Sequence, residues 1–404
     1  MRTISPIISL ILLLFVLNAH TQVSHPDNKK ATKEYEVAVY YFPNFHLDKR
    51  NENYHGKGWS EWELVKEARP RFEGHRQPKV PLWGYTDEAD PDQMAEKIQA
   101  ASSNGIYAFI FDWYYYNDGL FLERALEEGF MKSKNNNLMK FSIMWANHDW
   151  VDCFPCTAGT TPKLLYPGKI SIQTWDKMTD YIIANYFRHP SYWLIDGAPY
   201  FSIYHLNMLI DIFGTVEETA KGLENFRIKT KAAGFSDLNL NAVINRHTKQ
   251  EIKDPATLKK LGFNSFTTYT WFHHVKMEEF PTTQYDYVRE EYFDYIEKTF
   301  LNYDIPYYPN VTMGWDASPR TNQNFKYEKS DYPFTSIIVG NTPDAFTLAL
   351  KQSKSFLDKH SKGNKILTIN AWNEWTEGSY LEPDIVYKMG YLEAIKEVFT
   401  STRR

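Results

Sequence analysis

Eight short apolar runs recur along the chain, and each is rich in β-branched and aromatic residues. They extend over residues 35–42, 107–115, 140–147, 198–205, 238–245, 263–271, 306–315 and 365–372. Nearly continuous apolar runs are typical of strands that are buried on both faces, as in parallel sheets. Segments with helical periodicity separate them, so the pattern predicts an α/β fold of the (β/α)8 TIM barrel type.

The helical segments carry start and stop signals. Residues 90–105 open with Asp-Pro and close with glycine, and apolar side chains recur at helical spacing in residues 285–301. In residues 342–363, Thr342 can cap the first turn, and residues 387–399 predict an eighth helix. No Gly-rich phosphate loop follows the first strand, which favours the barrel over a doubly wound open sheet.

The first 21 residues predict a secretory signal peptide. Arg2 supplies a positive start, and the apolar run at residues 7–17 is too short for a stable membrane anchor. Small residues at 19 and 21 indicate cleavage before Gln22. No cysteine lies near that point, which argues against a lipid anchor. We therefore expect export to the periplasm or the medium without membrane insertion, with residues 22–404 forming one barrel domain.

Composition narrows the possible partners. Among the 404 residues, 43% are hydrophobic and the net charge is −5, with no run of lysine or arginine, so no nucleic-acid partner is expected. Aromatic residues reach 16%, including 12 Trp and 28 Tyr. Aromatic rings stack on sugars, so this surplus suggests a carbohydrate ligand, although a large aromatic core would also explain it.

Cys153 and Cys156 are the only two cysteines. In an exported protein we interpret them as a structural staple of a loop in preference to a redox or metal site. His, Asp and Glu residues show no H-E-x-x-H or comparable spacing, so we expect no metal and no cofactor.

Polar and aromatic residues follow the predicted strands, where the active site of a barrel lies. They predict a pocket for a polyhydroxylated ligand. The candidate substrate-binding residues are His46, Trp59, Asp112, Trp113, Trp145, Asn147, His148, Asp149, His247, Trp271, Trp315, Asp316, Arg320, Asn373 and Trp375. Structural alternatives stay open: single histidines can be satisfied polar groups, Asp316 and Arg320 can form a rim ion pair, Trp113 and Trp271 can be core, and Trp59 can pin a loop.

Glu374 and Glu377 are the candidate catalytic residues. They stand three residues apart at the end of the last strand, so one helical turn would direct both at the barrel mouth. Glycosyl transfer to water needs two carboxyl groups. Trp372 and Trp375 beside them would exclude water and keep one acid protonated. The alternative is a solvated helix start, where a glutamate interacts favourably with the helix dipole. That alternative explains either glutamate alone, but it does not explain the tryptophans.

The stretches YYFPNFH, GKGWSEWELV, WANHDW, GWDASPR and NAWNEWTEGSYLEPD together resemble the glycoside hydrolase family 99-like proteins, often labelled WbsX-type. The resemblance covers nearly the whole chain after the signal peptide, and it implies a (β/α)8 barrel. Family 99 members are endo-acting α-mannosidases with an N-E-W-x-E motif. By this resemblance, Glu374 is the base that deprotonates the 2-hydroxyl of the sugar, and Glu377 is the acid and later the base. The implied reaction retains configuration through a 1,2-anhydro sugar.

Three functions therefore compete. We favour an exported retaining glycoside hydrolase that cleaves an α-linked, mannoside-like oligo- or polysaccharide. The WbsX label suggests a glycosyltransferase of polysaccharide biosynthesis instead, but such an enzyme should be cytoplasmic and carry a diphosphate or metal site. A non-catalytic carbohydrate-binding protein is the third alternative, and the two intact glutamates weigh against it.

Overall fold

The structure is a computed structural model that describes residues 34–152, 154–361 and 363–400. The predicted signal peptide and Cys153 lie outside the described residues. The described residues belong to one compact unit. Within it, eight parallel strands alternate with helices and close into a barrel, which confirms the predicted fold class.

The strands of the barrel pair in the order of the chain, and every pair is parallel. Pro309 divides the seventh strand into β12 and β13, because proline has no N–H for the ladder. The first half pairs with β10 and the second with β15, which closes the circle. The strands are β1 (Glu36–Tyr41), β2 (Ile106–Tyr116), β4 (Lys140–Trp145), β8 (Ala198–Ile203), β9 (Asn239–Val243), β10 (Ser265–Thr267), β12 (Tyr307–Tyr308), β13 (Asn310–Thr312) and β15 (Ile366–Asn370).

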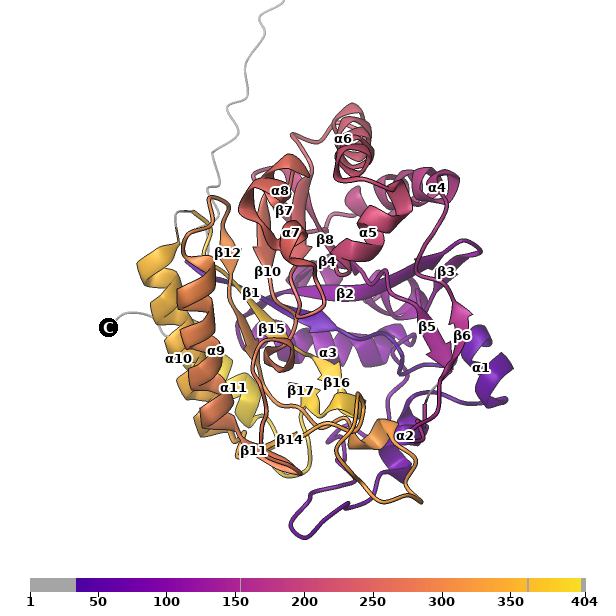
Figure 1. Ribbon diagram of the computed structural model, residues 1–404, viewed down its shortest axis with the longest axis vertical. Coiled ribbons are helices and arrows are strands. Elements are labelled where there is room, and N and C mark those ends of the chain that lie inside the picture. The colour runs from indigo at the N-terminus through magenta and orange to yellow at the C-terminus, as the bar shows by residue number, and fades with distance from the viewer. Residues whose placement is uncertain (1–33, 153, 362, 401–404) are drawn as a thin grey trace, which may run out of the picture. The chain divides into compact units, whose positions relative to one another are not determined.

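Helices cover the outside of the barrel (Figure 1). α9, α10 and α11 lie together beside β12, and α4, α5 and α6 lie near β4 and β8. The predicted caps are confirmed, since Asp90 accepts from the backbone of α3 and Thr342 from that of α10. The helices are α1 (Lys49–His55), α2 (Trp62–Glu67), α3 (Pro91–Ser103), α4 (Ile172–Ile182), α5 (Leu206–Phe213), α6 (Val216–Ala232), α7 (Gln250–Lys253), α8 (Pro255–Lys260), α9 (Tyr285–Phe300), α10 (Pro343–His360) and α11 (Gly390–Thr400).

Side chains alternate between two cores along each strand, as the period of two in a strand requires. In β2, Ala108 and Ile110 point into the barrel, while Phe109 and Phe111 join the larger core between the strands and the helices. Ala38 lies opposite Ala108 in this register. Asp112 continues the inward series to the carboxyl end of β2, where the barrel opens.

Short strands outside the barrel were not predicted, and all but the one directly before β8 lie in loops that follow barrel strands. They are β3 (Gly119–Phe121), β5 (Trp150–Asp152), β6 (Lys163–Tyr166), β7 (Leu194–Ile195), β11 (Thr282–Gln284), β14 (Ile337–Val339), β16 (Asn373–Glu374) and β17 (Ser379–Tyr380). β5 pairs with β6 and β16 pairs with β17, both antiparallel. The motif that carries the two candidate catalytic glutamates is therefore a small hairpin.

Candidate active site

A cavity of about 690 Å³ opens at the carboxyl ends of the barrel strands. Five carboxyl groups line it, and three of them belong together: Asp112 from β2, and Glu374 and Glu377 from the segment after β15. Arg320, from the loop after β13, lies among them, and the buried Glu61 from the first loop contacts Arg320 from behind the cavity lining. These five residues are called the carboxylate cluster below.

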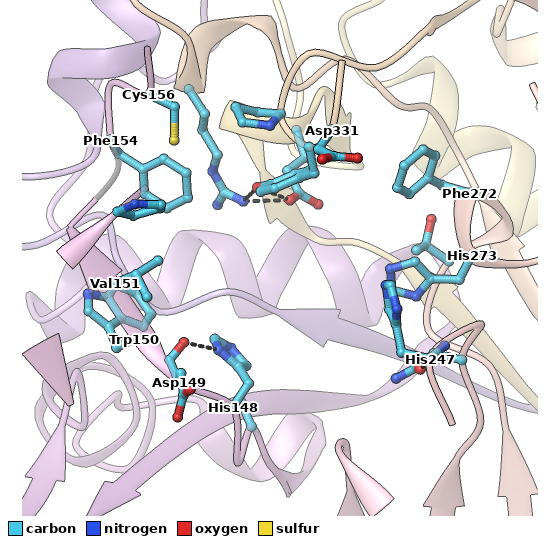
Figure 2. A pocket seen from close by; sticks show the side chains of 18 of the residues that line it. His148, Asp149, Trp150, Val151, Phe154, Cys156, His247, Phe272, His273 and Asp331 are labelled. Atoms are coloured by element: carbon cyan, nitrogen blue, oxygen red, sulfur yellow. Dashed lines mark hydrogen bonds and ion pairs between the residues drawn. The ribbon is translucent and has the colours of Figure 1, made fainter. Parts of the chain in front are cut away.

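The walls of the cavity come from loops on two sides. Figure 2 shows His148, Trp150 and Phe154 on one side, with His247 and Phe272 facing them across the cavity. Aromatic and polar groups thus alternate around the carboxylate cluster. This composition suits a ligand that presents both C–H faces and hydroxyl groups.

A tight turn directs both glutamates into the cavity. Trp375–Glu377 forms a 3₁₀ turn directly after β16, so the expected helical turn is confirmed. Gly378 ends it with φ 64°, and a Cβ built there would lie 2.6 Å from the Cβ of Asp316. Glycine therefore permits both the left-handed conformation and the close approach that hold the turn in place.

Arg320 joins the carboxylate cluster. Its Nη1 donates to Glu377 Oε1 at 2.5 Å, and its Nη2 donates to Glu374 Oε1 at 3.2 Å. Its Nε and Nη2 also donate to Glu61 Oε1, at 3.1 and 2.9 Å. Tyr332 adds a hydrogen bond from its hydroxyl to Glu377 Oε1 at 2.7 Å. The planar guanidinium thereby fixes the spacing of two carboxyl groups that would otherwise repel each other.

Tyr269 links Asp112 and Glu374. Its hydroxyl oxygen lies 2.8 Å from Asp112 Oδ2 and 2.8 Å from Glu374 Oε2. A phenol has one proton to donate, so when both contacts are hydrogen bonds, one of the two carboxyl groups carries a proton and donates it to the Tyr269 oxygen. A carboxyl–phenol–carboxylate chain therefore crosses this part of the cavity.

Burial explains the electrostatics of the carboxylate cluster. It raises the pKa of Glu374 well above its usual value, and the charge of Glu377 raises it further while Arg320 offsets part of the effect. Burial also raises the pKa of Glu377, and it raises that of Asp112 well above its usual value. Because one guanidinium faces four carboxyl groups in this cluster, full ionisation would leave buried negative charge, and a retained proton is favoured.

Residues beneath the turn hold it without reaching the cavity. Asn373 donates to the backbone oxygen of Phe42 at 2.7 Å and accepts from its backbone N–H at 2.8 Å, which fastens the motif to the end of β1. Trp372 and Trp375 both donate their indole N–H to Glu382, at 3.1 and 2.7 Å. Neither indole lines the cavity, and both are fully buried in the core.

Six of the fifteen candidate substrate-binding residues line the cavity. They are Asp112, His148, Asp149, His247, Trp315 and Arg320. The structure does not place the other nine in its lining. These are His46, Trp59, Trp113, Trp145, Asn147, Trp271, Asp316, Asn373 and Trp375.

Local geometry explains why three tryptophans lie outside the cavity. Trp113 in β2 and Trp145 in β4 fall on the outward positions of their strands and pack in the core under the helices. Trp271 begins a 3₁₀ turn, and its indole donates to the backbone oxygen of Asn310 at 2.9 Å. The core alternative is therefore the correct one for Trp113 and Trp271.

Three further candidates support loops. Asn147 exchanges two hydrogen bonds with the backbone of His205, at 2.9 and 2.7 Å, and so ties the ends of β4 and β8. Trp59 stacks on His55 with ring centroids 4.0 Å apart. His46 is buried, with Nδ1 4.0 Å from Glu88.

Asp316 and Arg320 do not form the expected rim ion pair. Asp316 instead accepts from His75 at 3.0 Å and from Gln77 at 2.7 Å, and lies 3.2 Å from Lys79. Although burial acts to raise the pKa of Asp316, Lys79 and His75 hold it well below its usual range. Asp316 therefore anchors the seventh loop to the first, while Arg320 serves the carboxylate cluster.

Glu61 and three tyrosines of the site were not among the predicted site residues. Glu61 is fully buried and also accepts from Thr376 at 2.5 Å. Tyr269, Tyr204 and Tyr332 line the cavity. Tyr269 and Tyr204 stand near the ends of predicted strands, so the alternation of side chains along each strand could have identified them as pointing inward. No local sequence pattern indicates that Glu61 or Tyr332 belongs to the site.

In residues 34–400 apart from 153 and 362, no three His, Cys, Asp or Glu side chains are grouped so that they could hold a metal ion. Across the same part of the chain, each helix is too short or too polar to cross a bilayer.

A sequence profile of the family described as glycosyltransferase WbsX matches residues 37–395. A curated relative, the uncharacterized protein WxcX of Xanthomonas campestris pv. campestris strain B100, is 25% identical over 387 residues. The match covers 95% of this chain and 51% of WxcX, so the chain spans about half the length of the curated relatives it matches.

Two solved structures share the fold. A family 99 endo-alpha-mannosidase from Bacteroides thetaiotaomicron is 14% identical with a TM-score of 0.53, over 90% of this chain and 95% of that one. A glycoside hydrolase-like protein is 15% identical with a TM-score of 0.55, over 92% of this chain and 96% of that one. At these identities the likeness shows the barrel fold alone.

Proposed function

The chain belongs to the family described as glycosyltransferase WbsX, and we propose that it is a glycoside hydrolase that cleaves an α-linked, mannoside-like glycan with retention of configuration. One observation carries the proposal. Glu374 and Glu377 line the same cavity, and one guanidinium, that of Arg320, contacts both. Hydrolysis of a glycosidic bond needs two such carboxyl groups, one to protonate the leaving oxygen and one to act as nucleophile or base.

The sugar class is inferred from the resemblance and from the fold. The N-E-W-x-E motif of the α-mannosidases matches Asn373, Glu374, Trp375 and Glu377, and an endo-alpha-mannosidase shares the barrel. The cavity can enclose sugar residues, since sites for small ligands typically span about 300–1,000 Å³. An α-mannoside also places its 2-hydroxyl trans to the leaving group, as the anhydro reaction requires.

In the first step Glu374 acts as base and Glu377 as acid. The Glu374 carboxylate removes the proton of the 2-hydroxyl, O2 attacks C1, and the bond from C1 to the leaving oxygen breaks. Glu377 gives its proton to that oxygen. Since Glu377 Oε1 accepts from Arg320 and Tyr332, the proton to be donated sits on Oε2.

In the second step the roles reverse. Water attacks C1 of the 1,2-anhydro sugar, Glu377 takes the proton of the water, and O2 recovers its proton from Glu374 as the C1–O2 bond opens. Two inversions at C1 give net retention, and both glutamates return to their starting states.

Asp112 is suited to keep Glu374 ionised before the first step. Glu374 Oε1 contacts Arg320, which stabilises a negative charge there. Asp112 Oδ1 is buried without a hydrogen-bond partner among the described residues, so a charge on Asp112 is the less favourable one. We therefore place the shared proton on Asp112, which donates to Tyr269, while Tyr269 donates to Glu374.

The family description favours a second candidate, a glycosyltransferase. Such an enzyme would use a nucleotide sugar, which is a cytoplasmic substrate. The signal peptide that we expect at residues 1–21 would place the chain outside the cytoplasm, and export remains part of the proposal. Intact-mass measurement of the protein from its host would test cleavage before Gln22.

Substitution of the two glutamates tests the hydrolase proposal. Glu377→Gln should impair substrates with poor leaving groups far more than activated aryl glycosides, because an activated leaving group needs little protonation. Glu374→Gln should impair both equally, because the 2-hydroxyl must close on C1 whatever departs. Glu393→Gln is a matched control that should keep full activity, since Glu393 is an exposed glutamate of α11 outside the cavity lining. Mild and equal effects of both glutamine variants would contradict the assignment.

A further inference from the structure

The wall formed by the ends of β9 and β10 carries basic and nitrogen-rich side chains that the proposed reaction does not use. Arg246 and His247 follow β9, and Phe272 and His273 follow β10; all four line the cavity. Figure 2 shows His247, Phe272 and His273 together on one side. Arg246, His247 and His273 are called the basic wall below.

The main chain at the basic wall is held in place from beneath. The buried Asn245 side chain accepts from the backbone N–H of His247 at 2.9 Å and of Thr248 at 3.1 Å. Thr248 in turn accepts from the backbone N–H of Asn245 at 3.1 Å. The two residues that carry Arg246 and His247 into the cavity therefore sit in a closed turn and not in a loose loop.

Arg246 has no ionic partner within the described part of the chain. Its Nε donates to His247 Nε2 at 3.0 Å, and its guanidinium lies 4.7 Å from the centre of the Phe272 ring. Among the described residues no carboxylate lies within ion-pair distance of it, in contrast to Arg320, which contacts three. Both Nη groups are available to a ligand, and their fork matches the oxygens of a carboxylate or a sulfate.

The aromatic ring under the Arg246 guanidinium is held in place by other contacts. Phe272 also stacks on Trp315, with ring centroids 4.2 Å apart and an interplanar angle of 10°. Phe272 thus has a buried partner of its own, and the guanidinium of Arg246 also lies over its ring. Since Phe272 does not need Arg246 for its packing, a structural role does not explain the arginine. Its oriented guanidinium can instead bind an anion.

The two histidines extend this site as hydrogen-bonding groups. His247 accepts from Arg246 at Nε2, so its ring proton is on Nδ1 and it is neutral in this arrangement. Burial lowers the pKa of His273 well below its usual value, as do His274 and Arg246. His273 Nδ1 is buried and has no hydrogen-bond partner among the described residues.

The basic wall lines the same cavity as the two glutamates and Tyr204. Burial raises the pKa of Tyr204, the carboxylates Glu377, Asp112 and Glu374 raise it further, and Arg246 lowers it, so Tyr204 lies within reach of both sets of charges. Another carboxylate of the cavity, Asp149, stands on the other side in Figure 2. An anionic group in the cavity is therefore attracted to Arg246, whereas three carboxylates already offset the charge of Arg320.

We propose that the basic wall binds an anionic substituent, a carboxylate or a sulfate, on a sugar residue next to the cleaved bond, so that the substrate is an acidic glycan. The inference rests on the proposed function for the identity of the ligand as a glycan. The chemistry of recognition is shared by uronic acids and sulfated sugars, and the experiment distinguishes them.

Binding measurements by NMR titration test the inference without requiring turnover. The probes are mannose, mannuronic acid, mannose 6-sulfate and guanosine diphosphate. We expect at least one acidic sugar to bind about tenfold more tightly than mannose, since a charge-assisted fork is worth at least that factor. Arg246→Gln should abolish the difference, and Arg246→Lys should keep part of it. The control Arg188→Gln changes an exposed arginine at the helix layer. This variant should keep the full difference in affinity between the acidic sugar and mannose.

The pattern of results separates the possible outcomes. A preference for mannuronic acid identifies a carboxylate, and a preference for mannose 6-sulfate identifies a sulfate. Equal binding of neutral and acidic sugars, or an acidic preference that survives Arg246→Gln, overturns the inference. Arg246-dependent binding of guanosine diphosphate above both acidic sugars overturns it too and supports the transferase. Failure of hydrolysis with an Arg246-dependent acidic preference would contradict only the proposed reaction.

Discussion

Removal of the Tyr269 hydroxyl should shift the pH dependence of activity and not merely its level. That hydroxyl lies 2.8 Å from Glu374 Oε2 and donates to the base of the proposed reaction. Donation to a carboxylate stabilises its ionised form and lowers its pKa. In Tyr269→Phe the pKa of Glu374, which burial already raises, should rise further. The acid limb of the profile of kcat/KM against pH should then move to higher pH.

The size of the effect follows from the strength of one hydrogen bond to a charged group, about 1.5–3 kcal/mol. Because 1.4 kcal/mol corresponds to about a tenfold change, kcat/KM at the acidic end should fall by about 10- to 100-fold. At alkaline pH, where Glu374 is ionised in both proteins, the loss should be smaller. Steady-state kinetics over the full pH range of stability provide the assay.

Tyr204→Phe is the matched control for Tyr269→Phe. Tyr204 lines the same cavity, but its hydroxyl makes no hydrogen bond to Asp112 or Glu374. The control should keep the position of the acid limb. An equal loss for Tyr269→Phe at every pH, or an acid limb that moves to lower pH, would refute the chain of proton donation from Asp112 through Tyr269 to Glu374.

Two further predictions concern the same cluster. Asp112→Asn should lose less kcat/KM than Tyr269→Phe, because an amide N–H can donate to the tyrosine oxygen as the protonated acid does; a larger loss would show that Asp112 works as an anion. Arg320→Met should lower the free energy of unfolding by about 3–5 kcal/mol, because buried carboxylates lose their cation. Burial raises the pKa of both catalytic glutamates in the folded state, so stability is lost as pH rises, and denaturant unfolding should show a larger deficit at pH 8 than at pH 5; no dependence on pH would contradict this.

The barrel was predictable because its signal is local. Each buried parallel strand appears as a separate apolar run, and eight of them in alternation with helices leave few other architectures. The limits of individual strands were less predictable. The seventh is divided at Pro309, and β10 has only the three residues Ser265–Thr267.

Two of the errors among the candidate site residues come from position within a strand. Asp112 and Trp113 are neighbours, yet only the first points into the barrel, because Ala108 and Ile110 set the inward parity of β2. The same rule separates Met144 from Trp145 in β4. Counting parity from the buried part of the strand would have removed both tryptophans from the candidates.

The ionic contacts of the site could not be predicted from local sequence. Arg320 meets Glu61 from a loop 259 residues away, and it meets Glu374 and Glu377 from a third segment. Loops at the mouth of a barrel are set by tertiary packing and not by periodicity. The sequence indicated which residue types gather at the strand ends, but not which partners they choose.

The stereochemistry of the released sugar tests the central claim most directly. Purified protein is mixed in an NMR tube with a panel of neutral and acidic α-linked oligosaccharides, and the anomeric signals of the new reducing end are followed from the first minutes. The account predicts release of a sugar whose first anomer has the configuration of the cleaved bond, and no release by Glu374→Gln. A first product of inverted configuration, or cleavage that persists in Glu374→Gln, would contradict it.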